Sequence, residues 1–205
     1  MPSLAYTDGV LALVCLWLLS RASLPLGVRI AAGTLGAAAV LGVLRFSGLY
    51  PIPQWHQFVS MLGACAAFPL LAVAVLWPNA AVARQLKFAA IFFIGLAALG
   101  LLAVGVAQKR VVVDALTVIS VVAMLFSLAR GGRWPTALTT ALMLAGLLLF
   151  AAKATVVPAL VPGDLLHIGV AIGLLGLGVS GLWSATPNIE AQEAQEAQEA
   201  QAHSA

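Results

Sequence analysis

The stretch VLALVCLWLL at residues 10–19 decides the fold class, because ten consecutive side chains include no charged residue. The stretch GLLAVGVA at residues 100–107 is of the same kind. Neither stretch alternates between apolar and polar side chains, as the strands of a membrane β-barrel do. Of all 205 residues, 62% are hydrophobic and only 8% are charged, whereas soluble domains average about a quarter charged. The sequence therefore predicts an all-α protein embedded in a membrane.

Seven apolar segments are long enough, or nearly so, to cross a bilayer, which requires about 20 residues. The connections between them are short, so consecutive helices should be antiparallel neighbours in one transmembrane bundle. Pro69 falls inside the third segment and should disturb its helix, because proline lacks a backbone N–H. The predicted spans are Thr7–Ser20, Val28–Leu44, Gln54–Trp77, Phe88–Ala107, Val111–Ala129, Pro135–Ala152 and Asp164–Trp183.

Tryptophan and basic residues mark the ends of these spans. All five tryptophans fall near a predicted end, where amphipathic rings lie at the level of the lipid headgroups; they are Trp17, Trp55, Trp77, Trp134 and Trp183. The loops on one side hold six Lys and Arg residues and those on the other side hold four. This bias predicts that the N-terminus lies outside and the C-terminus in the cytoplasm. The basic residues are scattered and form no nucleic-acid-binding patch, so lipids are the expected surroundings.

The chain divides at about residue 186 into a bundle, residues 1–186, and a low-complexity tail, residues 187–205. The triplet Glu-Ala-Gln occurs four times from Glu190 to Gln201, and it contains no side chain larger than alanine that could be buried. We expect this tail to be solvated and disordered. Two cysteines, Cys15 and Cys65, lie inside spans and are expected to pack as small apolar residues. Glycines such as Gly169 and Gly173 should serve packing within the bundle, with a homo-oligomer interface as the alternative.

Titratable side chains occur at the start of every odd-numbered span, which places them on one side of the membrane. They are Asp8, His56, Asp114, Asp164 and His167. Ionisable groups inside a membrane are costly and commonly functional. Simpler interpretations exist for most of them. Asp8 and Asp164 each have the surroundings of a helix N-cap, His56 could be an interfacial histidine, and Asp114 could form an ion pair with Arg110.

Two spacings suggest chemistry at these starts. Asp164 and His167 are three residues apart, so both face one side of a helix, where a carboxylate can orient an imidazole or share a metal with it. Ser60 lies one turn after His56, a spacing at which an imidazole can reach a hydroxyl nucleophile. The candidate catalytic side chains are therefore Ser60 and Asp114. The candidate metal ligands are His56, His167, Asp164 and Asp8.

Seven spans, His56 with Ser60, and a last span starting with Asp164 and His167 resemble uncharacterised bacterial seven-helix inner-membrane proteins. More distantly they resemble the membrane hydrolases related to alkaline ceramidases and to progestin and adipoQ receptors. The resemblance implies a zinc ion held by three histidines that activates water against an amide or ester bond. The family has two histidines four residues apart in its last helix. Here the residues four away from His167 are Gly163 and Ala171, so an aspartate would have to replace the missing ligand.

Three other functions remain open. His56 and His167 could be the two axial ligands of a haem in an electron-transfer protein. The acids could relay protons in a transporter or a proton-coupled accessory subunit. Alternatively, the protein could be structural, with acids that only cap helices. The sequence therefore predicts the class of protein but leaves its activity unassigned.

Overall fold

The computed structural model describes residues 2–50, 52–106 and 110–183, and every regular element in these ranges is helical. Seven helical segments are long and apolar enough to cross a membrane. The protein is thus an all-α, polytopic helical bundle, as the sequence predicts. The predicted tail lies outside the described residues. The spans are Ser3–Ser20, Leu26–Phe46, Pro53–Leu76, Leu86–Val106, Arg110–Arg130, Trp134–Ala151 and Pro162–Val179.

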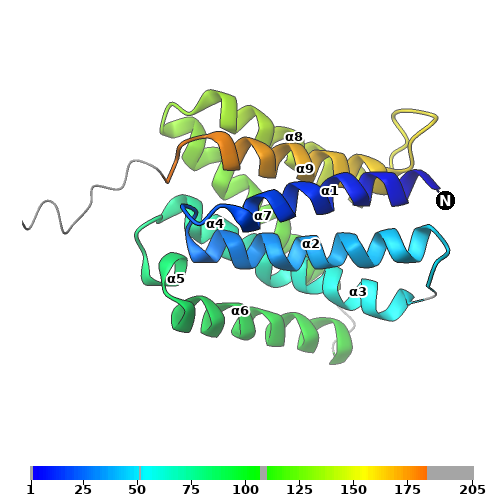
Figure 1. Cartoon of the computed structure of the whole chain (residues 1–205), viewed down its shortest axis with the longest axis horizontal. Coiled ribbons are helices and arrows are strands. Elements are labelled where there is room, and N and C mark those ends of the chain that lie inside the picture. The colour runs from blue at the N-terminus through cyan, green and yellow to red at the C-terminus, as the bar shows by residue number, and fades with distance from the viewer. Residues whose placement is uncertain (1, 51, 107–109, 184–205) are drawn as a thin grey trace, which may run out of the picture.

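The third span is the centre of the bundle and consists of three helical pieces. They are α3 (Pro53–Leu62), a π-helical segment η1 (Gly63–Ala67) and α4 (Phe68–Leu76). This span packs against α2 (Leu26–Phe46), α6 (Leu86–Leu101) and α7 (Arg110–Arg130). Short α5 (Ala81–Arg84) connects α4 to α6, which lies at the edge of the bundle (Figure 1) and continues into a second π-helical segment, η2 (Leu102–Val106).

The first and last spans lie side by side although they are at opposite ends of the sequence. Helix α1 (Pro2–Ser20) packs between α2 and α9 (Pro162–Val179), and α9 packs on its other side against α8 (Trp134–Ala151), as Figure 1 shows. Because α1 and α9 both begin at the same end of the bundle, their first turns meet. This meeting of the two N-terminal turns is what positions the candidate site.

Glycines bring α8 and α9 into backbone contact. A Cβ added at Gly146 would lie 2.7 Å from the carbonyl oxygen of Leu165, and one added at Gly169 would lie 2.8 Å from that of Leu142. These distances are shorter than any Cβ tolerates without backbone movement, so only glycine permits this approach. The prediction that the glycines of the last span pack within the bundle is confirmed for Gly169.

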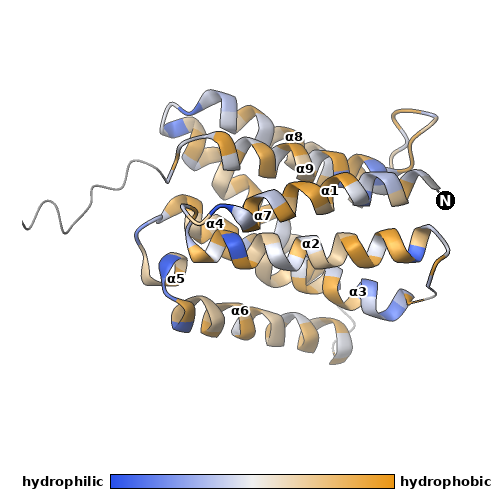
Figure 2. Ribbon diagram, in the orientation of Figure 1, coloured by the Kyte–Doolittle hydropathy of each residue, from blue (hydrophilic) through white to orange (hydrophobic). Residues whose placement is uncertain are grey.

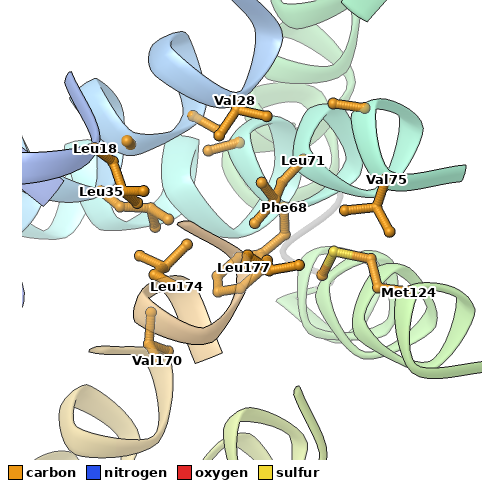
Figure 3. Packing of buried hydrophobic residues seen from close by; sticks show 14 of the residues in the cluster. Leu18, Val28, Leu35, Phe68, Leu71, Val75, Met124, Val170, Leu174 and Leu177 are labelled. Atoms are coloured by element: carbon orange, nitrogen blue, oxygen red, sulfur yellow. The ribbon is translucent and has the colours of Figure 1, made fainter. Parts of the chain in front are cut away.

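The core consists of apolar side chains that come mainly from α1, α2, α4, α7 and α9, and Figure 3 labels ten of them. Cys15 and Cys65 are both free and buried, as expected for small packing residues. The prediction that Trp183 lies at the level of the lipid headgroups is wrong. It is only 6% exposed and its indole N–H donates to the carbonyl oxygen of Ala74 at 3.1 Å. An indole with a backbone acceptor inside the bundle can be buried without an unsatisfied donor.

The π-helical segment η1 is the consequence of Pro69. In an α-helix the carbonyl of Cys65 would pair with the N–H of residue 69, which proline lacks. The chain widens by one residue at this point, so that the N–H of Phe68 donates to Gly63. The carbonyl of Ala64 then loses its α-helical partner, and the hydroxyl of Thr117 in α7 donates to it at 2.8 Å. A hydroxyl from a neighbouring helix is a usual way to satisfy such a carbonyl in a membrane protein.

Candidate functional site

Asp8 is completely enclosed by the bundle, with 1% of its surface exposed. Helix α1 begins at Pro2, so Asp8 lies nearly two turns inside it and the predicted capping role is wrong. Space for the carboxyl group comes from α2, where Gly42 lies opposite. A Cβ at position 42 would be 2.6 Å from Asp8 Cγ. The sequence thus places a carboxylate and a facing glycine on two adjacent helices, which allows an acid into the core.

The Asp8 carboxyl group has a partner for only one of its two oxygens. Oδ1 lies 3.2 Å from Nδ1 of His167 in α9. Oδ2 is buried and has no hydrogen-bond partner among the described residues. A buried carboxylate oxygen without a partner has lost its hydrogen bonds to water, and no protein hydrogen bond offsets that cost. Protonation of this carboxyl group, or a positively charged ligand at Oδ2, would therefore stabilise the site.

His167 connects this carboxyl group to the surface of the bundle. Its side chain is 16% exposed, and its Nδ1 also lies 3.5 Å from the hydroxyl oxygen of Thr7. When Asp8 is ionised, the proton of a neutral His167 ring belongs on Nδ1, where it can be donated to Asp8 Oδ1. Nε2 is then left with its lone pair, free to accept a second proton.

Asp164 is fully buried, and both of its carboxylate oxygens are occupied. Oδ1 accepts a hydrogen bond from the Thr7 hydroxyl at 3.0 Å, and Oδ2 accepts one from the backbone N–H of Val161 at 3.0 Å. Asp164 is the third residue of α9 and Val161 precedes the helix, so the prediction that Asp164 is the N-cap is wrong. It instead reaches back to the N-cap residue, as the acid of a capping box does.

Thr7 is a site residue that sequence reasoning missed. Its hydroxyl oxygen is within hydrogen-bonding distance of Asp164, of His167 and of the carbonyl oxygen of Leu4. The available signal was its position directly before Asp8. That signal becomes informative only once α1 is known to pack against α9. Thr7, Asp8, Asp164 and His167 together are called the Asp8 cluster below.

Charge in the Asp8 cluster does not balance without an added positive charge. Two carboxylates share one imidazole, and the carboxylates of Asp8 and Asp164 are close enough to repel each other. No Lys or Arg side chain forms an ion pair with either acid among the residues described. Even with His167 protonated, two ionised acids would leave a net negative charge in the membrane, which is costly. The cluster therefore favours binding a proton or a small cation.

His56 lies close to the cluster but belongs to a separate pair. Its Nδ1 accepts a hydrogen bond from Arg45 Nη1 at 3.1 Å, and its ring packs edge-on against Phe46 at 5.5 Å between centroids. His56 still interacts electrostatically with His167. In the described part of the chain, no hydrogen bond joins His56 to Ser60. The predicted nucleophile pair is thus not brought together.

Asp114 lies outside the cluster. It is 56% exposed and forms an ion pair with Arg110, one helical turn before it, at 3.8 Å. The simpler interpretation of Asp114 as an ion-pair partner is confirmed. An exposed pair of this kind contributes little to stability.

The geometry does not provide a metal centre. Among the residues that the structure describes, no group of three or more His, Cys, Asp or Glu side chains could hold a metal ion. Of the four predicted ligands, Asp8, Asp164 and His167 do converge. Asp164 is occupied by Thr7 and Val161, and His167 faces Asp8 Oδ1, so among the described residues only Asp8 Oδ2 is left without a partner. Nδ1 of His56 accepts a hydrogen bond from Arg45, so the proton of the neutral ring is on Nε2 and neither nitrogen offers a free lone pair in this arrangement.

The fold and its spans define a multi-pass helical membrane protein. Comparison of the chain with protein-family models, with curated proteins and with solved structures finds no match.

Proposed function

We propose that the protein takes part in proton-coupled transport across the membrane, as a transporter or as an accessory subunit, with the Asp8 cluster as its proton-binding site. The observation that carries the proposal is the Asp8 carboxyl group, which is 1% exposed. Among the described residues it forms no ion pair with Lys or Arg, and one of its oxygens has no hydrogen-bond partner. Intramembrane acids of this kind commonly bind or relay protons.

The pair of Asp8 and His167 supplies a short path for the proton. His167 Nε2 accepts a proton from the aqueous side while its Nδ1 proton passes to Asp8 Oδ1 over 3.2 Å. The N–H bond at Nδ1 breaks and an O–H bond forms at Oδ1, and the ring stays neutral because it has gained one proton and lost one. The hydroxyl of Thr7 keeps Asp164 in place and holds the first turn of α1 against α9.

Proton binding can be measured directly in the purified, lipid-reconstituted protein. Infrared difference spectra between acidic and alkaline pH should contain the carbonyl band of a buried protonated carboxyl group. Asp8→Asn, which keeps the shape of the side chain, should remove that band and abolish proton uptake by proteoliposomes driven by a membrane potential. Asp114→Asn is the matched control and should preserve both. A full band and unchanged uptake in Asp8→Asn would refute the proposal.

The remaining features of the function rest on the loop charges and the resemblance. The excess of Lys and Arg on one side supports an inner-membrane protein with the Asp8 cluster near the outer face and the C-terminus in the cytoplasm.

The resemblance to zinc-dependent membrane hydrolases makes amide or ester hydrolysis the second candidate. It is favoured by a carboxylate that orients His167, as carboxylates orient metal-binding histidines. Metal analysis of the purified protein tests it, since stoichiometric zinc lost in His167→Ala would favour hydrolysis over proton binding.

A haem group is a weaker candidate. Axial ligation requires a lone pair from each of two histidines. Because Nδ1 of His56 accepts a hydrogen bond from Arg45, Nε2 carries the proton of the neutral ring and has no lone pair to offer. An absorption spectrum of the purified protein distinguishes this case, because a bis-histidine haem would give intense visible bands.

A further inference from the structure

Six basic side chains gather at the end of the bundle opposite the Asp8 cluster. They come from the end of α1, the first turn of α2, α5, the start of α6, the end of α7 and the residue before α8, as the hydrophilic patches at these points of Figure 2 illustrate. Four of the six are exposed. We call this surface the basic face; it comprises Arg21, Arg29, Arg84, Lys87, Arg130 and Arg133.

No carboxylate of the described residues lies at this end. Asp8 and Asp164 are in the first two turns of α1 and α9, and Asp114 is in the second turn of α7, all at the other end of the bundle. Both ion pairs found in the described ranges are at that other end as well. No described acid therefore neutralises the positive charge of Arg21, Arg29, Lys87, Arg130 and Arg133.

Two arginines of the basic face are arranged to receive an anion. Arg29 is only partly exposed, and its Nε–H is buried without a hydrogen-bond acceptor among the described residues. A buried guanidinium donor without an acceptor is costly, and an anionic oxygen is its best partner. The guanidinium group of Arg21 lies 5.0 Å from the ring centre of Trp17, which holds the cation beside an aromatic surface.

Aromatic residues place this surface at the depth of lipid headgroups. Trp77 and Trp134 are 59% and 66% exposed and lie at the end of α4 and the start of α8, at the same end of the bundle. Exposed tryptophans at span ends lie in the interfacial layer of the bilayer. Phosphate groups of lipids are in that layer, within reach of the arginine and lysine side chains.

We propose that the basic face binds the headgroups of anionic phospholipids in the adjacent leaflet, with Arg29 as a donor to a phosphate oxygen. The attraction comes from positive charge that no acid of the described residues neutralises, held next to an anionic membrane surface. The proposal is independent of the proton-binding function, because it uses none of the residues of the Asp8 cluster.

The test is a titration of the full-length protein in mild detergent with phosphatidylglycerol or phosphatidylcholine, with bound lipid counted by native mass spectrometry. The wild type should prefer phosphatidylglycerol, and added salt should weaken this preference. Each basic side chain removed should lower the affinity for phosphatidylglycerol about fivefold. Suitable variants are Arg29→Gln and the double exchange Arg21→Gln with Lys87→Gln. The double variant changes only exposed side chains and so keeps the test valid if Arg29→Gln does not fold.

Arg110→Gln is the matched control, because Arg110 is exposed at the opposite end of the bundle. It should leave the lipid preference unchanged. Equal affinity of the wild type for the two lipids would overturn the proposal, and so would an equally large effect of Arg110→Gln.

The C-terminal tail of the same chain could compete with lipid for the basic face, because it contains acidic residues. All four glutamates of the sequence lie between residues 190 and 199, beyond Trp183, which belongs to the same end as the basic face. Deletion of residues 188–205 should leave the affinity for phosphatidylglycerol unchanged. A rise of about tenfold or more would show that the tail, and not lipid, is the natural occupant, and would overturn the proposal.

Discussion

A single glycine determines whether Asp8 can be inside the bundle. Gly42 leaves the volume into which the Asp8 carboxyl group fits, and any side chain there would meet that group directly. The acid in α1 and the glycine in α2 are therefore one structural unit. Asp8 brings an ionisable group into the bundle, and Gly42 leaves the space that this group needs.

We expect Gly42→Ala to destabilise the protein in detergent by about 1–3 kcal/mol, the usual cost of overpacking, and to reduce proton binding at Asp8. The added methyl group must displace the carboxyl group from His167 or push α1 away from α2. Thermal unfolding and the infrared band of Asp8 measure the two effects. Gly9→Ala is the control on the same pair of helices, since its Cβ would be 4.0 Å from the nearest atom of Val43. Equal stability of the two variants would contradict this account.

The third span shows how a transmembrane helix accommodates a proline in its interior. Pro69 removes one N–H, the helix widens at η1, and Thr117 from α7 supplies the hydrogen bond that Ala64 has lost. The disturbance expected at Pro69 from the sequence does occur. Its form, a π-helical segment stabilised by a hydroxyl group on another helix, depends on which helix packs there.

Thr117→Val should therefore cost about 0.6–1.7 kcal/mol, the range measured for hydrogen bonds between membrane helices. Pro69→Ala should reduce that cost, because residue 69 regains an N–H and Ala64 can return to an α-helical hydrogen bond. A double-mutant cycle of unfolding free energies measures this coupling. Thr140→Val is the control, since the Thr140 hydroxyl bonds only to the carbonyl of Thr136 in its own helix. Strictly additive effects of the Thr117 and Pro69 exchanges would contradict the explanation.

The two ends of the whole molecule differ in their charged residues, because one end has both acids and basic residues, among them Arg45, Arg110 and Lys153, and the other has only the basic face among the described residues. The described acids lie at the end where α1 begins, and the basic face lies at the end where α1 finishes. A bilayer separates these two ends, so the orientation decides which compartment exchanges protons with the Asp8 cluster.

Reporter fusions test that orientation. Fusions at Lys87 and Asn188 should both report the cytoplasm, and a fusion after Tyr50 should report the outside, because the loops with more Lys and Arg remain in the cytoplasm. A cytoplasmic signal after Tyr50 would reverse the orientation. Opposite locations for Lys87 and Asn188 would contradict the seven spans.

The tail can be tested at the same scale. Deletion of residues 188–205 should leave the melting temperature in detergent and proton uptake unchanged, because the Glu-Ala-Gln repeat contains no side chain that could be buried in the bundle. Differential scanning fluorimetry is the measurement, with a deletion of α9 residues as the destabilised reference. A fall of many degrees would show that the tail stabilises the bundle.

The sequence alone determined the class of protein, the number of spans and the fact that the titratable groups share one end of the bundle. These follow from local composition, because an apolar segment of sufficient length has only one stable environment, the lipid interior. Asp114 with Arg110 was also predictable, since both residues lie on one helix and the helical repeat brings them together. What only the tertiary structure decided is the membership of the Asp8 cluster. Thr7 and Asp8 meet Asp164 and His167 across more than 150 residues of sequence. No local pattern encodes that contact, which arises because α1 packs against α9.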